Sequence, residues 1–116
     1  MVVDKPSEAD LDRLFQAFAD RTRRDILTRA LNAEYSVSEL AAHYAMSFAA
    51  VQKHVAVLER ASLITKEKRG REQIVRVQVE ALRRARRLLD EYEKVWRDRA
   101  DRIADILTEG MKGQPK

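Results

Sequence analysis

The sequence predicts a mainly α-helical fold with one small β-hairpin. Three observations lead to this prediction. Only three glycines and two prolines interrupt the 116 residues, apolar residues recur at helical spacing through most of the chain, and the apolar period shortens to two over residues 64–79. A chain of this length can bury one hydrophobic core, so we expect a single domain spanning residues 1–116.

Composition excludes several classes of protein. Hydrophobic residues make up 45% and charged residues 36% of the chain, as in folded globular proteins. No stretch approaches the ~18 uncharged apolar residues of a membrane span, and the N-terminus lacks the pattern of a secretory signal. The absence of cysteine excludes disulfides and thiolate metal sites. We therefore expect a cytoplasmic protein with no membrane partner.

The net charge of +4 hides a segregation along the chain. Residues 1–46 carry 6 basic and 8 acidic side chains, residues 47–87 carry 11 and 4, and residues 88–116 carry 6 and 7. The middle segment thus holds an excess of +7, which indicates a polyanionic partner, nucleic acid before an anionic membrane surface. The count alone is equally compatible with a solvated charged surface.

Two amphipathic helices are predicted at the N-terminal end. The first, over residues 7–19, is indicated by apolar residues spaced three and four apart: Leu11, Leu14, Phe15 and Phe18. Asp20 can cap the second helix, whose apolar stripe consists of Ile26, Leu27, Ala30 and Leu31. Residues 32–35 are expected to form a loop.

The next segment predicts two short helices joined by a tight turn at residues 45–46. Ser36 and Glu39 have the spacing of a capping box, in which each side chain accepts a hydrogen bond from the other residue's amide, and they begin a helix over residues 37–44. Ser47 can cap a second helix over residues 48–61. The packed side of that helix carries Val51, Val55, Leu58 and Ser62. Its opposite side carries Ala49, Gln52, Lys53, Ala56 and Arg60.

Residues 36–61 therefore have the form of a helix-turn-helix, whose second helix is free to enter a major groove of DNA. Residues 64–79 then alternate as a β-hairpin with Gly70 near its tip. We expect Val75, Val77 and Val79 to pack on the helices and an arginine pair, Arg69 and Arg71, to lie exposed at the tip. A hairpin in this place is a wing, so residues 7–79 predict a winged helix-turn-helix core.

A long helix is predicted over residues 80–107, followed by a flexible tail over residues 108–116. Two rows of side chains recur every seven residues: Leu82, Leu89, Trp96 and Ile103, and Ala85, Tyr92, Arg99 and Ile106. A helix of ~28 residues is ~42 Å long, so its apolar face needs a partner, which we expect to be a second copy of the chain. Tyr92 and Trp96 could also line a ligand pocket, and Arg99 could pair with an aspartate of the partner or mark a polar cavity.

Residues 14–107 resemble the ArsR-type winged helix-turn-helix regulators of bacteria. Residues 20–27, DRTRRDIL, are similar to a helix start of the family, with Arg21 where proline is usual. Residues 36–41, SVSELA, resemble the beginning of its support helix. Residues 46–64, MSFAAVQKHVAVLERASLI, resemble its recognition helix and the exit into the wing, with Ser62 where glycine is frequent. Residues 69–72, RGRE, resemble its wing tip.

This resemblance implies a homodimer that binds pseudo-palindromic operator DNA, usually as a repressor released by an effector. In many members the effector is a metal or metalloid, and here the sequence departs from the pattern. The thiolate pair of some members would fall at Ala41 and His43, and the terminal helix has no histidine for the ligand set of others. We therefore predict no metal site and no cofactor, apart from a weak zinc alternative at His43 and His54, and the effector is unknown.

The candidate residues fall into two groups and include no catalytic set, because the chain has no cysteine nucleophile and no glycine-rich phosphate loop. Gln52 can bond to adenine, Lys53 can donate to guanine, and Phe48, unless it belongs to the core, can touch thymine methyls. The predicted DNA-binding residues are Ser36, Ser47, Phe48, Ala49, Gln52, Lys53, His54, Ala56, Arg60, Arg69 and Arg71. The predicted dimerisation residues are Leu11, Leu14, Phe15, Leu82, Leu89, Tyr92, Trp96, Ile103 and Ile106.

The sequence is compatible with two functions. A sequence-specific, double-stranded-DNA-binding regulator is favoured by the whole pattern. The alternative is a winged-helix module for protein–protein contact whose basic wing docks on an acidic partner and which has only non-specific affinity for DNA.

Overall fold

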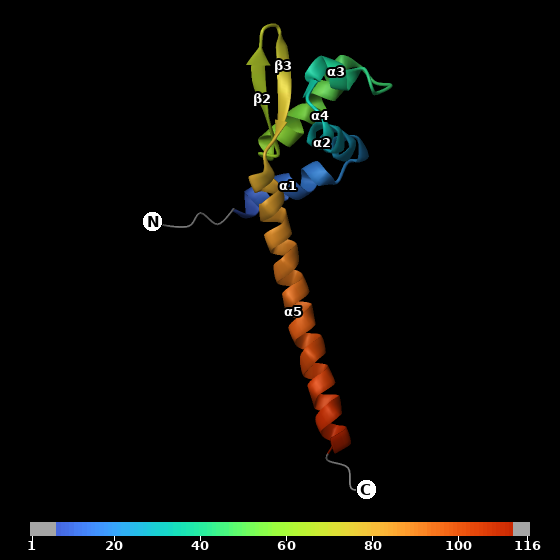
Figure 1. Ribbon diagram of the computed structural model, residues 1–116, viewed down its shortest axis with the longest axis vertical. Coiled ribbons are helices and arrows are strands. Elements are labelled where there is room, and N and C mark those ends of the chain that lie inside the picture. The colour runs from blue at the N-terminus through green and yellow to red at the C-terminus, as the bar shows by residue number, and fades with distance from the viewer. Residues whose placement is uncertain (1–6, 113–116) are drawn as a thin grey trace, which may run out of the picture. The chain divides into compact units, whose positions relative to one another are not determined.

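The structure is a computed structural model that describes residues 7–112 of the chain (Figure 1). Its elements are α1 (Glu8–Phe18), α2 (Arg21–Asn32), β1 (Tyr35–Ser36), α3 (Val37–Ala41), α4 (Phe48–Arg60), β2 (Ile64–Arg69), β3 (Glu72–Val77) and α5 (Val79–Lys112). The predicted fold class is confirmed: the chain is mostly helical and carries a small antiparallel sheet in a winged helix-turn-helix arrangement. The chain divides into two compact units between Ala85 and Arg86, inside α5, and the first unit holds all the other elements.

The three predicted helix starts are confirmed by their hydrogen bonds. The Asp20 carboxylate accepts from the amide of Arg23 at 3.0 Å and caps α2. Ser36 and Glu39 form the reciprocal capping box of α3, and the Ser47 hydroxyl accepts from the amide of Ala50 at the start of α4. Each cap satisfies an amide that would otherwise lack a partner in the first turn of its helix.

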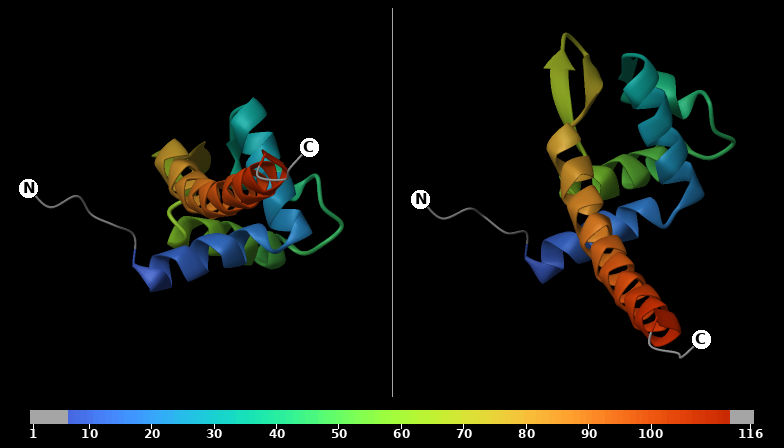
Figure 2. Two further views of the ribbon diagram at one scale, coloured as in Figure 1. Left: turned by 90° about the horizontal axis from the view of Figure 1, so that it is seen from below. Right: turned by 60° about the horizontal axis from the view of Figure 1, so that its bottom comes forward.

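Helix α4 is the centre of the first unit. It contacts α1, α2, α3 and β2, and α1 and α4 lie side by side in Figure 2. Its side chains Val51, Val55 and Leu58 are all at most 1% exposed. The core continues through residues of the neighbouring elements: Ile26, Leu27, Leu40, Leu63, Ile64 and Val75. With one face fixed in this way, the opposite face of α4 is turned outward.

The sheet has three strands in the order β1-β3-β2, one more than the predicted hairpin. The expectation of a loop at residues 32–35 was wrong at its end, because Tyr35 and Ser36 pair with Val75 and Ile74 of β3. A strand of two residues has no periodicity of its own, so the pairing depends on a distant part of the chain. Ser36 is 1% exposed as a result.

Several boundaries and burial expectations differ from the structure. The hairpin ends at Val77, and Val79, expected to be packed, is exposed and begins α5, whereas the unexpected Ile74 is buried. Helix α3 ends at Ala41, so residues 42–47 form a longer turn than predicted. Helix α5 continues to Lys112, which makes residues 108–112 helical instead of part of a flexible tail. Residues 113–116 of that expected tail lie outside the described residues.

Ser62 was expected on the packed side of α4 and is instead exposed, with a φ of 60° in the turn after the helix. Non-glycine residues adopt this left-handed conformation at a cost, whereas glycine adopts it freely. Relief of the left-handed conformation should raise the free energy of unfolding of Ser62→Gly by about 1 kcal/mol. The greater freedom of glycine in the unfolded chain reduces this gain. Urea titration followed by circular dichroism measures this change. The control Ser62→Ala keeps the conformational cost, so a destabilised glycine variant beside an unchanged alanine variant would contradict the explanation.

No helix among the described residues combines the length and the apolar character needed to cross a membrane.

Candidate nucleic-acid interface and self-association face

The outward face of α4 is the main candidate surface for nucleic acid. Ala49, Gln52, Lys53 and Arg60 are exposed and Ala56 is half-buried. Phe48 is 47% exposed, which argues against the alternative that it belongs to the core. Ser47 is exposed as well, at the helix start, where its hydroxyl is already engaged by the amide of Ala50 at 3.1 Å.

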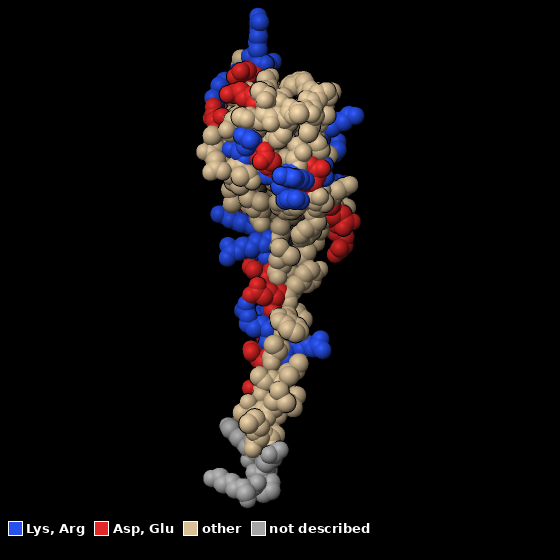
Figure 3. Space-filling model, turned by 90° about the vertical axis from the view of Figure 1, so that its right-hand side faces the viewer, with Lys and Arg blue, Asp and Glu red and all other residues tan. Residues whose placement is uncertain are grey.

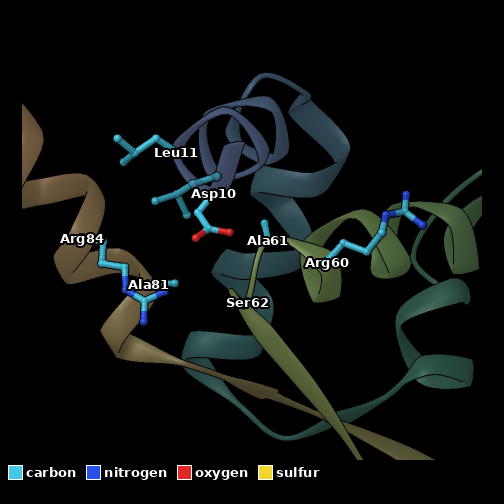
Figure 4. Close-up of a pocket in the computed structure, with 8 residues that line it drawn as sticks. Asp10, Leu11, Arg60, Ala61, Ser62, Ala81 and Arg84 are labelled. Atoms are coloured by element: carbon cyan, nitrogen blue, oxygen red, sulfur yellow. The ribbon is translucent and has the colours of Figure 1, made fainter. Parts of the chain in front are cut away.

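Lys53 and Arg60 are the two cations of this face, and both can pair with an anion from outside the chain. Within residues 7–112, neither Lys53 nor Arg60 forms an ion pair or a side-chain hydrogen bond. Arg60 borders a pocket of about 150 Å³ between α1, the end of α4 and the start of α5, together with Asp10 and Arg84. Figure 4 shows the Arg60 side chain running away from Asp10. The arginine is therefore free to meet an outside anion.

His54 connects α4 to the start of α2. Its Nδ1 atom lies 3.3 Å from Nη1 of Arg23 and 3.7 Å from Oδ2 of Asp20, and its side chain is 23% exposed. Arg23 also donates to the carbonyl of Gln16 at 2.8 Å and so ties the end of α1 to this point. The hydrogen bond from the Arg23 amide holds the pKa of the Asp20 carboxyl below its usual value. His54 thus lies in an internal network, and its contact with DNA stays a prediction.

The wing presents its charges unevenly. Gly70 has a φ of 64°, and it forms with Arg71 a two-residue turn between the paired residues Arg69 and Glu72. A positive φ at the first turn residue suits a hairpin turn of the II′ type. Arg71 forms no ion pair with any described residue, whereas Arg69 is bonded to Glu34. The two arginines of the predicted tip are therefore not equivalent.

Sequence reasoning missed one exposed cation and one acid on this surface. Lys68 is exposed on β2 without an ion pair among the described residues, and the alternation along the strand could have indicated it. Glu34 pairs with both Arg69 and Arg76, which no local pattern could have revealed. Conversely, the structure does not bring Ser36 to the surface: it is 1% exposed and its hydroxyl accepts from the Glu39 amide at 3.1 Å.

The second unit carries a continuous exposed apolar face on α5. Trp96 is 62% exposed, and the same face includes Leu89, Tyr92, Val95, Ile103, Ile106, Leu107 and Met111. Figure 3 shows uncharged surface along one side of α5 and acidic and basic side chains along another. The charged side is stabilised within the helix, for example by the Lys94–Asp98 pair at 3.1 Å. An exposed apolar face of this length is the expected surface of an interaction with another chain.

The predicted dimerisation residues of the first unit are less exposed. Leu14 is 3% exposed in the chain's own core, so the structure does not offer it to a partner. Leu11 is half-buried, and Phe15 and Leu82 are half-buried against the core. Arg99 lies within the apolar face of α5 and has no ion pair among the described residues, so the aspartate partner expected for it is not supplied by its own helix.

Comparison with known proteins decides the family. The HTH-type transcriptional regulator Rv2034 of Mycobacterium tuberculosis is 35% identical over 81 residues, which cover 70% of this chain and 76% of that protein. A solved ArsR family transcriptional regulator, RHA00566, is 32% identical with a TM-score of 0.74, over 78% of this chain and 94% of that one. The chain belongs to the ArsR family of transcriptional regulators. An ArsR-like regulator from Rhodococcus sp. RHA1 agrees, at 33% identity and a TM-score of 0.78 over 87% of this chain and 93% of that one. No protein-family model matches the chain.

This ArsR-family chain has no evident metal centre in its described part. Residues 7–112 contain no group of three or more histidine, cysteine, aspartate or glutamate side chains placed to hold a metal ion. His43 is exposed and its ring meets Tyr35 edge-on with 5.7 Å between centroids, while His54 is engaged by Arg23. Neither histidine therefore lies in a ligand cluster.

A second polar cluster stabilises the support helix of this ArsR-family fold. The Tyr44 hydroxyl donates to Oδ2 of Asp25 at 2.5 Å, and Arg29 donates to the same oxygen at 2.9 Å. Burial, reinforced by this hydrogen bond, raises the pKa of Tyr44 to about 12. The phenol therefore stays protonated at neutral pH and fastens the turn after α3 to α2.

Proposed function

We propose that the chain binds operator DNA as a homodimer, reads its sequence with α4 and represses transcription. The observation that carries this proposal is the outward face of α4, which is exposed and whose cations Lys53 and Arg60 form no ion pair with any residue of the described range 7–112. Helix α4 is held from behind by Val51, Val55 and Leu58, so this face can enter a major groove without disturbing the core.

The side chains of α4 suit direct readout of bases. The Gln52 amide can accept a hydrogen bond from adenine N6 and donate one to adenine N7. Lys53 can donate to guanine O6 and N7. Phe48 and Ala49, at the start of the helix, offer apolar contact to thymine methyl groups. Arg71 and Lys68 are exposed cations of the wing that can donate to phosphates, and such contacts position the protein without reading sequence.

The homodimer is proposed to form through the apolar face of α5, with Leu11 and Phe15 of α1 contributing. A two-fold pairing brings identical faces together and produces two α4 helices related by symmetry. Such a pair reads a pseudo-palindrome whose half-sites are centred about one helical turn, ~34 Å, apart. Each protomer then brings its basic residues 47–87 to the DNA phosphates, and the affinity for DNA depends steeply on salt concentration.

Selection from a random DNA pool at about 150 mM salt tests the proposal. The purified chain is expected to enrich a palindrome with half-sites one turn apart. Binding without enrichment, lost as the salt concentration rises, would leave only non-specific electrostatic affinity and would favour the protein–protein module. Reporter assays with the selected operator then distinguish repression from activation.

Arg71→Ala is expected to weaken binding to operator and to unrelated duplexes by similar factors, because a phosphate contact carries no sequence information. Removing one phosphate contact per protomer should also reduce the slope of log K against log salt by about 0.9 per protomer. Fluorescence anisotropy over a salt series measures both quantities. A loss confined to the operator, with an unchanged slope, would instead identify Arg71 as a base-reading residue.

A further inference from the structure

One arginine of the wing is drawn away from the hairpin tip by an acidic residue outside the hairpin. Arg69 is the last residue of β2, and its register partner is Glu72 beside the turn. Its Nη1 atom nevertheless donates to Oε1 of Glu34, in the connection between α2 and β1. The two residues are 35 positions apart in sequence.

The sheet register shows how far back Arg69 reaches. Glu34 precedes Tyr35, which pairs with Val75, so Glu34 lies beside Arg76 of β3. The ion pair between Arg76 Nη1 and Glu34 Oε2 at 3.0 Å agrees with this placement. Arg76 is four residues along β3 from the Glu72 row, or about 13 Å at the rise of a strand. The Arg69 side chain therefore runs back along the sheet toward Arg76, away from the hairpin tip.

Glu34 occupies a small anion site built from two guanidinium groups. Arg69 and Arg76 converge on its two oxygens, and Arg76 is held in place by a second bond to Glu67 at 2.9 Å. The hydrogen bond from Arg69 lowers the pKa of the Glu34 carboxyl, so the carboxylate is charged at neutral pH. A phosphate is an oxyanion that accepts the same paired N–H donors.

We propose that Glu34 competes with the DNA backbone for Arg69. In the free protein the carboxylate holds the arginine back, and in the complex a DNA phosphate takes its place. This inference rests on the proposed function and deepens it by assigning Glu34 as a residue that limits affinity. The exchange costs little, because the side chains of Arg69 and Glu34 are 52% and 44% exposed and water already screens their attraction.

The variant that tests this is Glu34→Gln in the full chain. It is expected to bind operator and unrelated duplexes about two- to fivefold more tightly for each protomer of the dimer, since one exposed pair is worth only this much. The slope of log K against log salt should stay nearly unchanged, because Arg69 contacts a phosphate in the complex of the parent chain as well as in that of the variant. In an Arg69→Ala background the same substitution should tighten binding no more than the loss of one negative charge does, because Glu34 then has no Arg69 to hold.

Glu72→Gln is the matched control. It removes one negative charge from the residue opposite Arg69 in the hairpin, but Glu72 forms no ion pair with the residues that the structure describes. Any tightening it causes acts through the general field and should persist in the Arg69→Ala background. A Glu34→Gln effect that persists there in full and exceeds that of Glu72→Gln, or a loss of affinity in Glu34→Gln, overturns the competition. Failure of the unsubstituted chain to bind any duplex overturns the proposed function instead, and this inference with it.

Discussion

Trp96→Glu is expected to convert the chain to monomers and to abolish operator binding at concentrations where the unsubstituted dimer is saturated. Trp96 is 62% exposed at the middle of the apolar face of α5. Burial of a large apolar side chain contributes about 3 kcal/mol, and a symmetric dimer holds two copies. The loss of about 6 kcal/mol weakens dimerisation by about four orders of magnitude, before the cost of placing a carboxylate in an apolar interface is added.

Sedimentation velocity across a concentration series measures the change in association. Thr108→Glu is the matched control, because it introduces the same charge into the same helix at an exposed position away from the apolar face. The core of the first unit contains neither residue, so both variants should unfold at the same urea concentration as the parent chain. A Trp96→Glu variant that stays dimeric like the control would show that self-association uses a different surface.

The helix starts were predictable from sequence because each depends on neighbouring residues only. Asp20, Ser36 and Ser47 bind amides three positions later, so their side-chain type and spacing carry the whole signal. The wing was predictable for a related reason, since alternation marks a strand and Gly70 marks its turn. The winged helix-turn-helix follows from the order of these local elements.

The features that sequence could not supply depend on pairing between distant residues. Tyr35 and Ser36 become a strand only because β3 lies beside them, and Glu34 meets Arg69 only through that pairing. The amphipathic pattern of α1 puts Leu14 on the apolar face of the helix, but it does not show whether the chain's own core or a second copy covers that face. The structure assigns it to the core.

The candidate site likewise contains residues whose exposure followed from the sequence and residues whose surroundings only the folded structure shows. The outward positions of α4 followed from the 100° turn per residue, so Gln52 and Lys53 were placed correctly on the exposed face. Phe48 lay at the border of that face, and only the packing of the helix against its neighbours established that it is 47% exposed. His54 was separable from the base-reading residues only once its contacts with Arg23 and Asp20 were known.

Lys53→Ala is expected to weaken operator binding at least tenfold and to weaken binding to unrelated duplexes far less. A good contact to a base edge is worth about 1–3 kcal/mol of discrimination, and the dimer makes it twice. Lys53 is exposed, and its replacement breaks no ion pair or side-chain hydrogen bond among residues 7–112. Competition assays with operator and shuffled duplexes at one salt concentration give the specificity ratio directly.

Arg21→Ala controls for the loss of one positive charge, because Arg21 is also exposed and without an ion pair in the described part of the chain, yet lies outside α4 and the wing. It should lower affinity for all duplexes slightly and leave the specificity ratio unchanged. If Lys53→Ala behaves in the same way, Lys53 contacts only phosphate. The reading of sequence would then fall to Gln52 and the apolar start of α4, and the base preferences of the selected operator would be expected to centre on adenine and thymine in place of guanine.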